Sequence, residues 1–212
     1  SALTLPLLGF GCMRLPRITP DNPAIDYPTV KKMIDRAMLA GCNYFDTAYM
    51  YHGGESEKCL GELLKSYSRD AYYLADKMPV WFAKKESDVE RIFKEQLARC
   101  KTDYFDFYML HALDKANWEL AKKFHACEFL RKMKKEGKIR KLGFSFPRHS
   151  GNAPDHRRCA GMGFRADSAQ LPRLGTLPFP RTVRNSDESR HSGHHHGTAA
   201  RRRARLALPR SG

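Results

Sequence analysis

Apolar and polar residues alternate along the first two thirds of the chain in a pattern that predicts short strands separated by amphipathic helices. Residues 5–11 form a short apolar run that ends in Gly-Phe-Gly, and residues 27–39 carry apolar side chains at helical spacing. A second strand is predicted over residues 43–46, followed by a helix over residues 55–67 whose first turn Ser56 is placed to cap. The chain therefore opens with two successive strand–helix units.

The same alternation continues through the middle of the chain. Strands are predicted over residues 72–75, 104–110 and 139–144, and helices over residues 86–100 and 118–135. Five strands that alternate with four helices favour an α/β fold in which helices cover a parallel sheet. The spacing fits both a doubly wound sheet and a closed eight-stranded barrel.

Polar and ionisable residues fall at the ends of several predicted strands, and this placement favours the barrel. They are Asp46, Lys77, His111 and Ser145. Side chains at the carboxyl ends of barrel strands form the active face of that fold. No G-x-G-x-x-G motif follows the first predicted strand, which argues against a dinucleotide-binding doubly wound unit.

Five motifs accompany these strands in order: GFGCMRLP from residue 9, FDTAYMY from residue 45 continuing into GESE, DKMP from residue 76, DFYMLH from residue 106 and KEGKIRKLGFS from residue 135. Together they resemble the signatures of the aldo/keto reductase family over residues 1–146. The resemblance implies a (β/α)8 TIM barrel, of which this part of the chain holds about five β/α units.

The resemblance also implies a catalytic quartet, which is Asp46, Tyr51, Lys77 and His111. A hydride delivered to a carbonyl carbon leaves an alkoxide that must be protonated, and a free tyrosine with a pKa of about 10 is a reluctant acid. In the family's scheme Lys77 lowers the pKa of Tyr51, Asp46 keeps Lys77 charged, and His111 orients the carbonyl. The competing Tyr49 has the wrong spacing from Asp46, and a lone histidine at a strand end is more often structural.

The implied cofactor is NADP(H), and the implied cofactor contacts are Gly11, Cys12, Met13, Asp46 and Ser145. Many relatives have asparagine after the serine, whereas this chain has Phe146. The Gly-Phe-Ser-Phe sequence and the opening motif point to a bacterial and archaeal branch whose members often add a C-terminal iron-sulfur segment. This chain shows no cysteines of that kind, and no metal site is predicted.

Composition and cysteine usage indicate a globular cytoplasmic protein. Of the 212 residues 42% are apolar, with no run of about 18 apolar residues and no signal-peptide pattern. Six scattered cysteines lack C-x-x-C spacing, so we predict reduced, mostly buried thiols. The expected partner is a small-molecule carbonyl substrate, with no membrane and no nucleic acid, and the oligomeric state is left open.

Residues 147–212 differ sharply from the rest in composition. They contain 13 arginines but no lysine, isoleucine, tyrosine or tryptophan, and they carry a net charge of +9 against +6 for residues 1–146. Three interpretations compete: a basic nucleic-acid-binding arm, a metal-binding tail around His194, His195 and His196, and a reading-frame error.

Codon constraints favour the reading-frame error. Methionine has only the codon ATG and glycine codons begin with GG, so Met162-Gly163 forces the tryptophan codon TGG in the frame that starts one base later. With permissible codons, residues 161–175 become GWDFVQIQLNYLDWE, residues 191–204 become GIPVIIMEPLRGGA, and residues 147–151 become HDTPE. These resemble the family's sixth-strand region, its seventh-strand region and the continuation of its fifth strand.

We therefore hypothesise one inserted base at the Phe146/Pro147 junction, which makes residues 147–212 an out-of-frame, disordered tail. A barrel needs all its strands to close, so the chain as written is expected to be inactive. The expected family function is NADP(H)-dependent reduction of aldehydes or ketones. The alternatives are a non-catalytic NADPH-binding barrel subunit and, if the tail is genuine, a basic nucleic-acid-binding protein.

Overall fold

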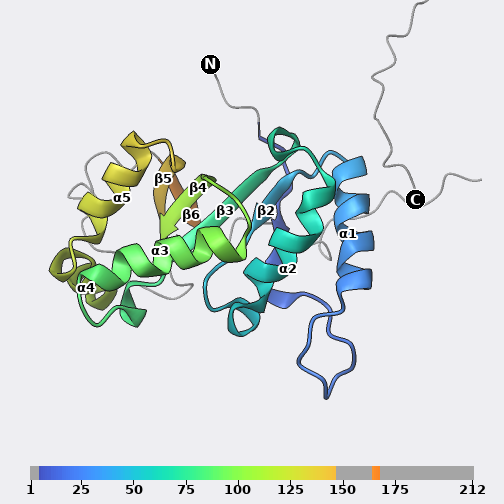
Figure 1. Cartoon of the computed structure of the whole chain (residues 1–212), viewed down its shortest axis with the longest axis horizontal. Helices are drawn as coiled ribbons and strands as arrows, with labels where there is room; N and C mark the ends of the chain where they lie inside the picture. Colours follow the sequence, from blue (N-terminus) through green and yellow to red (C-terminus); the bar gives the residue numbers. More distant parts are fainter. Residues whose placement is uncertain (1–4, 147–163, 168–212) are drawn as a thin grey trace, which may run out of the picture. The chain divides into compact units, whose positions relative to one another are not determined.

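The computed structural model describes residues 5–146 and 164–167. These residues belong to one compact unit, Ser1–Pro172. Within it, parallel strands alternate with helices, which confirms the predicted α/β class (Figure 1). The remaining unit, Arg173–Gly212, lies outside the described residues, as do the histidine triplet and the codon-restored segment over residues 191–204.

The described strands form one sheet in the order of the chain. They are β1 (Phe10–Gly11), β2 (Tyr44–Asp46), β3 (Tyr73–Met78), β4 (Phe105–Leu110), β5 (Ile139–Phe146) and β6 (Phe164–Asp167). Each strand is parallel to the next. A doubly wound sheet reverses its strand order part-way, whereas a barrel keeps the strands consecutive. Strand order therefore supplies the distinction that spacing could not, and it favours the barrel.

Five α-helices connect these strands. They are α1 (Tyr27–Leu39), α2 (Glu55–Leu63), α3 (Ser87–Arg99), α4 (Lys115–Lys123) and α5 (Ala126–Lys135). Helix α1 has the predicted bounds because the Asp26 side chain accepts the Thr29 N–H at 3.1 Å and a proline occupies the first turn. No helix within the described ranges is long and apolar enough to cross a membrane.

Several element boundaries differ from the prediction. The first strand is only Phe10–Gly11, and the third is longer than expected because pairing with β4 continues through Lys77 and Met78. The single helix predicted over residues 118–135 is two helices, since the chain turns at His125, whose φ is +50°.

The predicted helix over residues 55–67 begins at Glu55 as expected, but its end and its cap differ from the prediction. Helix α2 ends at Leu63 and continues as the 3₁₀ turn η3 (Leu64–Ser66). Ser56 does not cap its first turn, because its Oγ lies 2.9 Å from the Thr47 Oγ1 and donates to the Cys12 carbonyl at 3.1 Å. Ser56 is therefore a buried residue that contacts two preceding segments instead of capping the helix.

Strand β6 lies within residues 147–212, which were predicted to form an out-of-frame, disordered tail. It pairs with β5 in the register Gly143↔Phe164 to Phe146↔Asp167, so the sheet gains a sixth strand next to the fifth. The structure differs here from the expected five strands.

The two faces of the sheet carry separate apolar clusters. Successive strand residues point to opposite faces, so Leu74 and Met78 join the larger core, which also includes Phe93 of α3. Ala75 and Met109 lie in the second, smaller cluster. The five cysteines among the described residues are buried thiols that form no disulfide, as predicted, while Cys159 lies outside those residues.

Helices α2 and α3 make a close backbone contact at Gly61. A Cβ at this position would lie 2.3 Å from the Arg99 carbonyl oxygen and 2.7 Å from the Cys100 carbonyl carbon. Both are backbone atoms, which cannot move aside as a flexible side chain would. Gly61 therefore sets the distance between the two helices.

Gly61→Ala is expected to lower the free energy of unfolding by about 1–3 kcal/mol, the usual cost of overpacking, despite alanine's better helix propensity. Urea denaturation followed by circular dichroism measures the change. Gly11→Ala is the matched control, because an added Cβ there meets nothing within 4 Å. Unchanged stability of the Gly61 variant would contradict the close contact.

Candidate active site

The carboxyl ends of neighbouring strands bring the predicted site residues to one edge of the sheet. Asp46 is the last residue of β2, Lys77 lies one residue before the end of β3, and His111 directly follows β4. Gly11 ends β1 in register with Asp46, and Ser145 lies near the end of β5. This is the edge at which barrel enzymes place their chemistry.

Lys77 is the centre of the predicted quartet. Its Nζ donates to the Asp46 Oδ1 at 2.6 Å, to the Thr47 carbonyl at 2.7 Å and to the Tyr51 Oη at 3.4 Å. Only 6% of Lys77 is exposed, and these three acceptors match the three N–H donors of an ammonium. Burial alone would lower the pKa of Lys77, but the charge of Asp46 and its hydrogen bond to the ammonium raise it above its ordinary value.

Tyr51 lies in the 3₁₀ turn η2 (Tyr51–Gly54), which follows β2. The Lys77 Nζ is 4.9 Å from the centroid of its ring. Burial raises the pKa of Tyr51, and Lys77 lowers it by a smaller amount, so the net pKa stays above its ordinary value. The expected effect of Lys77 is present, but burial outweighs it.

His111 packs its ring edge-on against Tyr51, with the ring centroids 6.1 Å apart. Burial and the positive charge of Lys77 lower the pKa of His111 to about 3, so the imidazole is neutral. Its Nδ1 is buried and has no hydrogen-bond partner among the described residues. A buried polar atom without a partner is costly, and a ligand atom would satisfy it.

The backbone of Lys77 is held from the helix side of the sheet. The Gln96 side chain of α3 donates to the Lys77 carbonyl at 3.1 Å and to the Glu57 carboxylate at 2.9 Å. Arg99 donates to the other Glu57 oxygen at 2.9 Å. Burial, followed by the neighbouring Glu57, raises the pKa of Asp76 well above its usual range. This network was not predicted, because its members lie far apart in the sequence.

The predicted cofactor contacts fall into two groups. Gly11 is exposed with open space beside it, and Met13 is 58% exposed. Cys12, by contrast, is fully buried, and burial followed by the Asp46 charge raises the pKa of its thiol. The Ser145 Oγ accepts the Ala112 N–H at 3.0 Å, so its hydroxyl holds the turn that follows β4.

Two aromatic residues near the quartet have different roles. Tyr49 donates its hydroxyl to Glu95 at 3.0 Å and packs on Arg99, whose guanidinium lies 4.3 Å from the ring centroid. This agrees with the preference for Tyr51 as the acid. Trp81 was not predicted, yet its ring lies 5.2 Å from that of His111. Its sequence signal was only an aromatic residue after the third strand.

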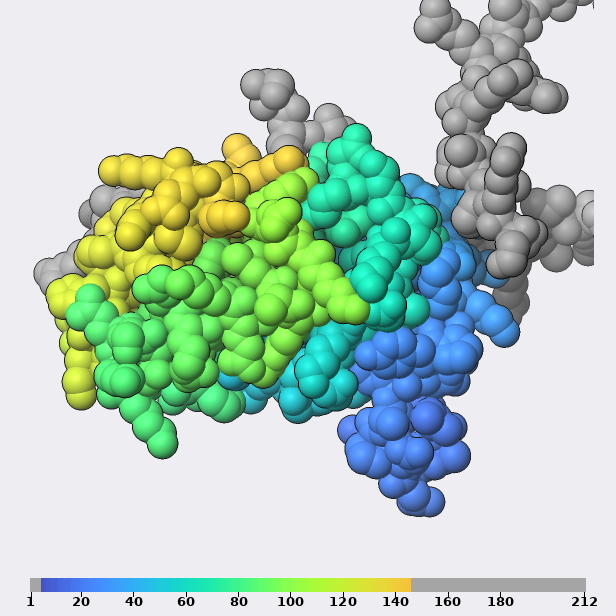
Figure 2. Space-filling view, viewed as in Figure 1, coloured from blue at the N-terminus to red at the C-terminus, as the bar shows by residue number. Residues whose placement is uncertain are grey.

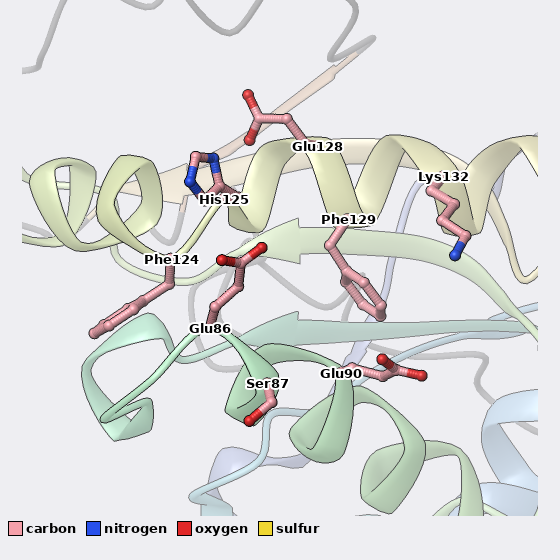
Figure 3. Close-up of a pocket in the computed structure, with 8 residues that line it drawn as sticks. All are labelled: Glu86, Ser87, Glu90, Phe124, His125, Glu128, Phe129 and Lys132. Carbon is pink, nitrogen blue, oxygen red and sulfur yellow. The ribbon is translucent and has the colours of Figure 1, made fainter.

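A shallow groove on the outer surface lies apart from this edge. Figure 3 shows that it is formed by the start of α3, the turn before α5, and α5 itself. The lining residues are Glu86, Ser87, Glu90, Phe124, His125, Glu128, Phe129 and Lys132. None of the quartet lines it. No group of three or more metal-ligating side chains that could hold a metal ion occurs in the described part of the chain.

Residues 7–152 match the family model described as "Aldo/keto reductase family". The chain belongs to the aldo/keto reductase family. The match extends six residues beyond Phe146, where the sequence resemblance ended. This membership and the consecutive parallel strands together support a partial (β/α)8 barrel.

Curated relatives match only part of their own length. The chain is 29% identical over 154 residues to the uncharacterized oxidoreductase YqkF of Bacillus subtilis, which covers 68% of the chain and 46% of the relative. It is 33% identical over 105 residues to the methylglyoxal reductase YeaE of Escherichia coli, which covers 50% and 34%. The chain thus spans about a third to a half of the curated relatives that it matches.

Solved structures of the family show the same partial coverage. The holo form of aldo-keto reductase AKR11C1 from Bacillus halodurans aligns with a TM-score of 0.56 at 29% identity, covering 69% of this chain and 48% of that one. An aldo-keto reductase from Klebsiella pneumoniae in complex with NADPH aligns with a TM-score of 0.55 at 26% identity, covering 68% and 46%.

The low pKa of His111 predicts a pH dependence of folding. In the unfolded chain this histidine titrates near 6.5, whereas in the folded chain it titrates at about 3. The unfolded state therefore binds the proton first as the pH falls. The contribution of neutral His111 to the free energy of unfolding is complete above pH 6.5. It is lost as the pH falls toward 3, at up to about 1.4 kcal/mol per pH unit.

When the free energy of unfolding is measured between about pH 7 and pH 4, His111→Gln is expected to remove the part of its pH dependence that this histidine causes. His125→Gln removes an exposed histidine and is expected to keep the wild-type slope. Identical slopes for the wild type and the His111 variant would show that this imidazole is not buried in its neutral form.

Proposed function

We propose that this chain carries the proton-transfer half of an NADP(H)-dependent reductase of aldehydes and ketones, with Tyr51 as the acid. One observation carries the proposal: the buried Lys77 ammonium lies within hydrogen-bond distance of both Asp46 and Tyr51. An ion pair that only stabilised the fold would not need a tyrosine hydroxyl as its third partner.

The residues at this edge fit the nicotinamide end of the cofactor. Gly11 leaves open space where an added Cβ would meet nothing within 4 Å, and Met13 is exposed beside it. The unpartnered His111 Nδ1 marks a place for a ligand atom. NADPH, when bound, would supply the hydride. The Klebsiella pneumoniae relative with NADPH in its structure supports this choice of cofactor.

Each member of the quartet has a defined task in this proposal. Tyr51 donates its proton to the alkoxide oxygen that forms on the substrate. The Lys77 ammonium stabilises the phenolate that remains, and Asp46 keeps Lys77 charged and in place. A neutral His111 retains one N–H that can donate to the substrate oxygen without competing for its proton.

We also propose that residues 147–212 are read out of frame. The composition changes at residue 147, and the family match stops at residue 152. Strand β6 falls on the residues whose restored translation is FVQI, within the segment that resembles the family's sixth strand. Sequencing the source DNA tests the idea, and a sequence in which no frame restores the predicted segments would refute it.

Activity is measured as carbonyl-dependent loss of NADPH absorbance. Two proteins are compared: the chain as written and a version with one base deleted at the Phe146/Pro147 junction. We expect turnover of small aldehydes such as methylglyoxal in the restored protein only. In that protein Tyr51→Phe is expected to lower kcat by about 100- to 10,000-fold, the usual range for losing a general acid.

Tyr49→Phe is the matched control, because it removes a neighbouring hydroxyl that binds Glu95 and does not contact Lys77. Equal losses in the two tyrosine variants would contradict the assignment of Tyr51. NADPH binding without turnover on any carbonyl would favour a non-catalytic barrel subunit. Turnover by the chain as written would refute the frame proposal.

A further inference from the structure

Two turns at the catalytic edge are joined by hydrogen bonds between a side chain and the backbone. The first turn follows β1 and contains η1 (Cys12–Arg14), and the second is η2, which carries Tyr51. The Leu15 N–H, just after η1, donates to the His52 Nε2 in η2 at 3.0 Å. The Ser56 Oγ, in the first turn of α2 directly after η2, donates to the Cys12 carbonyl at 3.1 Å. The turn with the exposed Met13 is thereby attached to the turn with the acid.

His52 makes its bond from an unfavourable backbone conformation. Its φ is +52°, and it is followed by two glycines with positive φ. Left-handed backbone is disfavoured for residues with a Cβ, although asparagine, aspartate and histidine tolerate it better than most. Glycine would suit this position better on conformational grounds alone. The imidazole bond to a residue 37 positions earlier gives a physical reason for a histidine here.

The bond requires a neutral imidazole, because a protonated Nε2 cannot accept a hydrogen bond. Partial burial and the charge of Arg17 lower the pKa of His52, while a backbone hydrogen bond with Met13 raises it by a smaller amount. Arg17 forms an antiparallel bridge with Ile25. Figure 2 shows that a blue segment near the start of the chain projects from the body of the protein. The charge around His52 therefore favours its acceptor form.

We propose that His52 is a positioning residue for the reductase reaction. Its Nε2 fixes the turn that bears Met13 against the turn that bears Tyr51, so the cofactor-facing backbone and the acid keep one relative position. The inference rests on the proposed function for its catalytic meaning, whereas the attachment of the two turns is a property of the chain itself.

Two matched variants distinguish the effect of the acceptor at the His52 Nε2 position from the effect of the left-handed backbone at residue 52. In His52→Gln the amide oxygen takes the position of Nε2 and keeps an acceptor. In His52→Asn the backbone tolerates the left-handed conformation, but the shorter side chain places its oxygen near the position of Nδ1. The two substitutions differ by one methylene group.

Hydrogen exchange of the 212-residue chain, followed by NMR, reports on both turns. The probes are the Leu15 amide and the Tyr51 amide, which donates to the Ala48 carbonyl at 3.0 Å. We expect wild type and His52→Gln to protect both amides and His52→Asn to lose about tenfold in protection. Protection factors at Leu15 should fall on acidification in the wild type and stay constant in His52→Gln.

Equal protection at Leu15 in all three proteins would overturn the attachment of the turns. Loss of protection at Leu15 with no change at Tyr51 would overturn the positioning of the acid. NADPH binding is measured separately in the frame-restored protein and its two His52 variants, and we expect it to weaken about three- to tenfold in His52→Asn relative to His52→Gln. Failure of the frame-restored protein to bind NADPH would count against the proposed function, while the exchange data would still decide the role of His52.

Discussion

The buried Lys77 ammonium is the constraint on which the rest of the site depends. Removing an ammonium from water is costly unless paired charges and hydrogen bonds replace the lost hydration. Here Asp46, Thr47 and Tyr51 supply the acceptors, and all three come from β2 and the turn that follows it. Lys77 reaches these acceptors only in the observed register of β3, because a slip of one residue would turn its side chain toward the helices.

The Lys77 charge lowers the pKa of both of its aromatic neighbours. It adds to burial, the larger effect, in lowering the pKa of His111, which keeps that imidazole neutral. It also lowers the pKa of Tyr51, but burial keeps that hydroxyl protonated. A protonated phenol next to a neutral imidazole is the arrangement that a proton donor and a hydrogen-bonding group require. Burial is the larger effect for both groups, and Lys77 adds to it at His111 and opposes it at Tyr51.

Much of the fold and the main site residues could be predicted from the sequence. The alternation of short apolar strands with amphipathic helices predicted the α/β class. The motifs placed Asp46, Lys77 and His111 at strand ends and Tyr51 in the turn after the second strand. Spacing could not decide between a barrel and a doubly wound sheet, because that distinction depends on which strands pair. Strand order resolves it.

The missed features depend on contacts that no local pattern records. The Thr47 contact uses a backbone carbonyl, which every residue has, so side-chain identity cannot predict it. Ser56 has the residue type of a helix cap, but it binds groups brought close only by the tertiary fold. His52 lies between two parts of a recognised motif and was not singled out, because its bond reaches a residue in a different turn.

The proposal that most needs a test is that NADPH bound at this edge of the sheet gives its hydride to a carbonyl compound while Tyr51 gives the proton. The most direct measurement uses the frame-restored protein with an aldehyde and with NADPH that carries deuterium at the transferable hydride position. Mass spectrometry of the alcohol then shows where the label goes. The account predicts deuterium on the former carbonyl carbon. Alcohol formed without deuterium, or consumption of NADPH without alcohol, would contradict it.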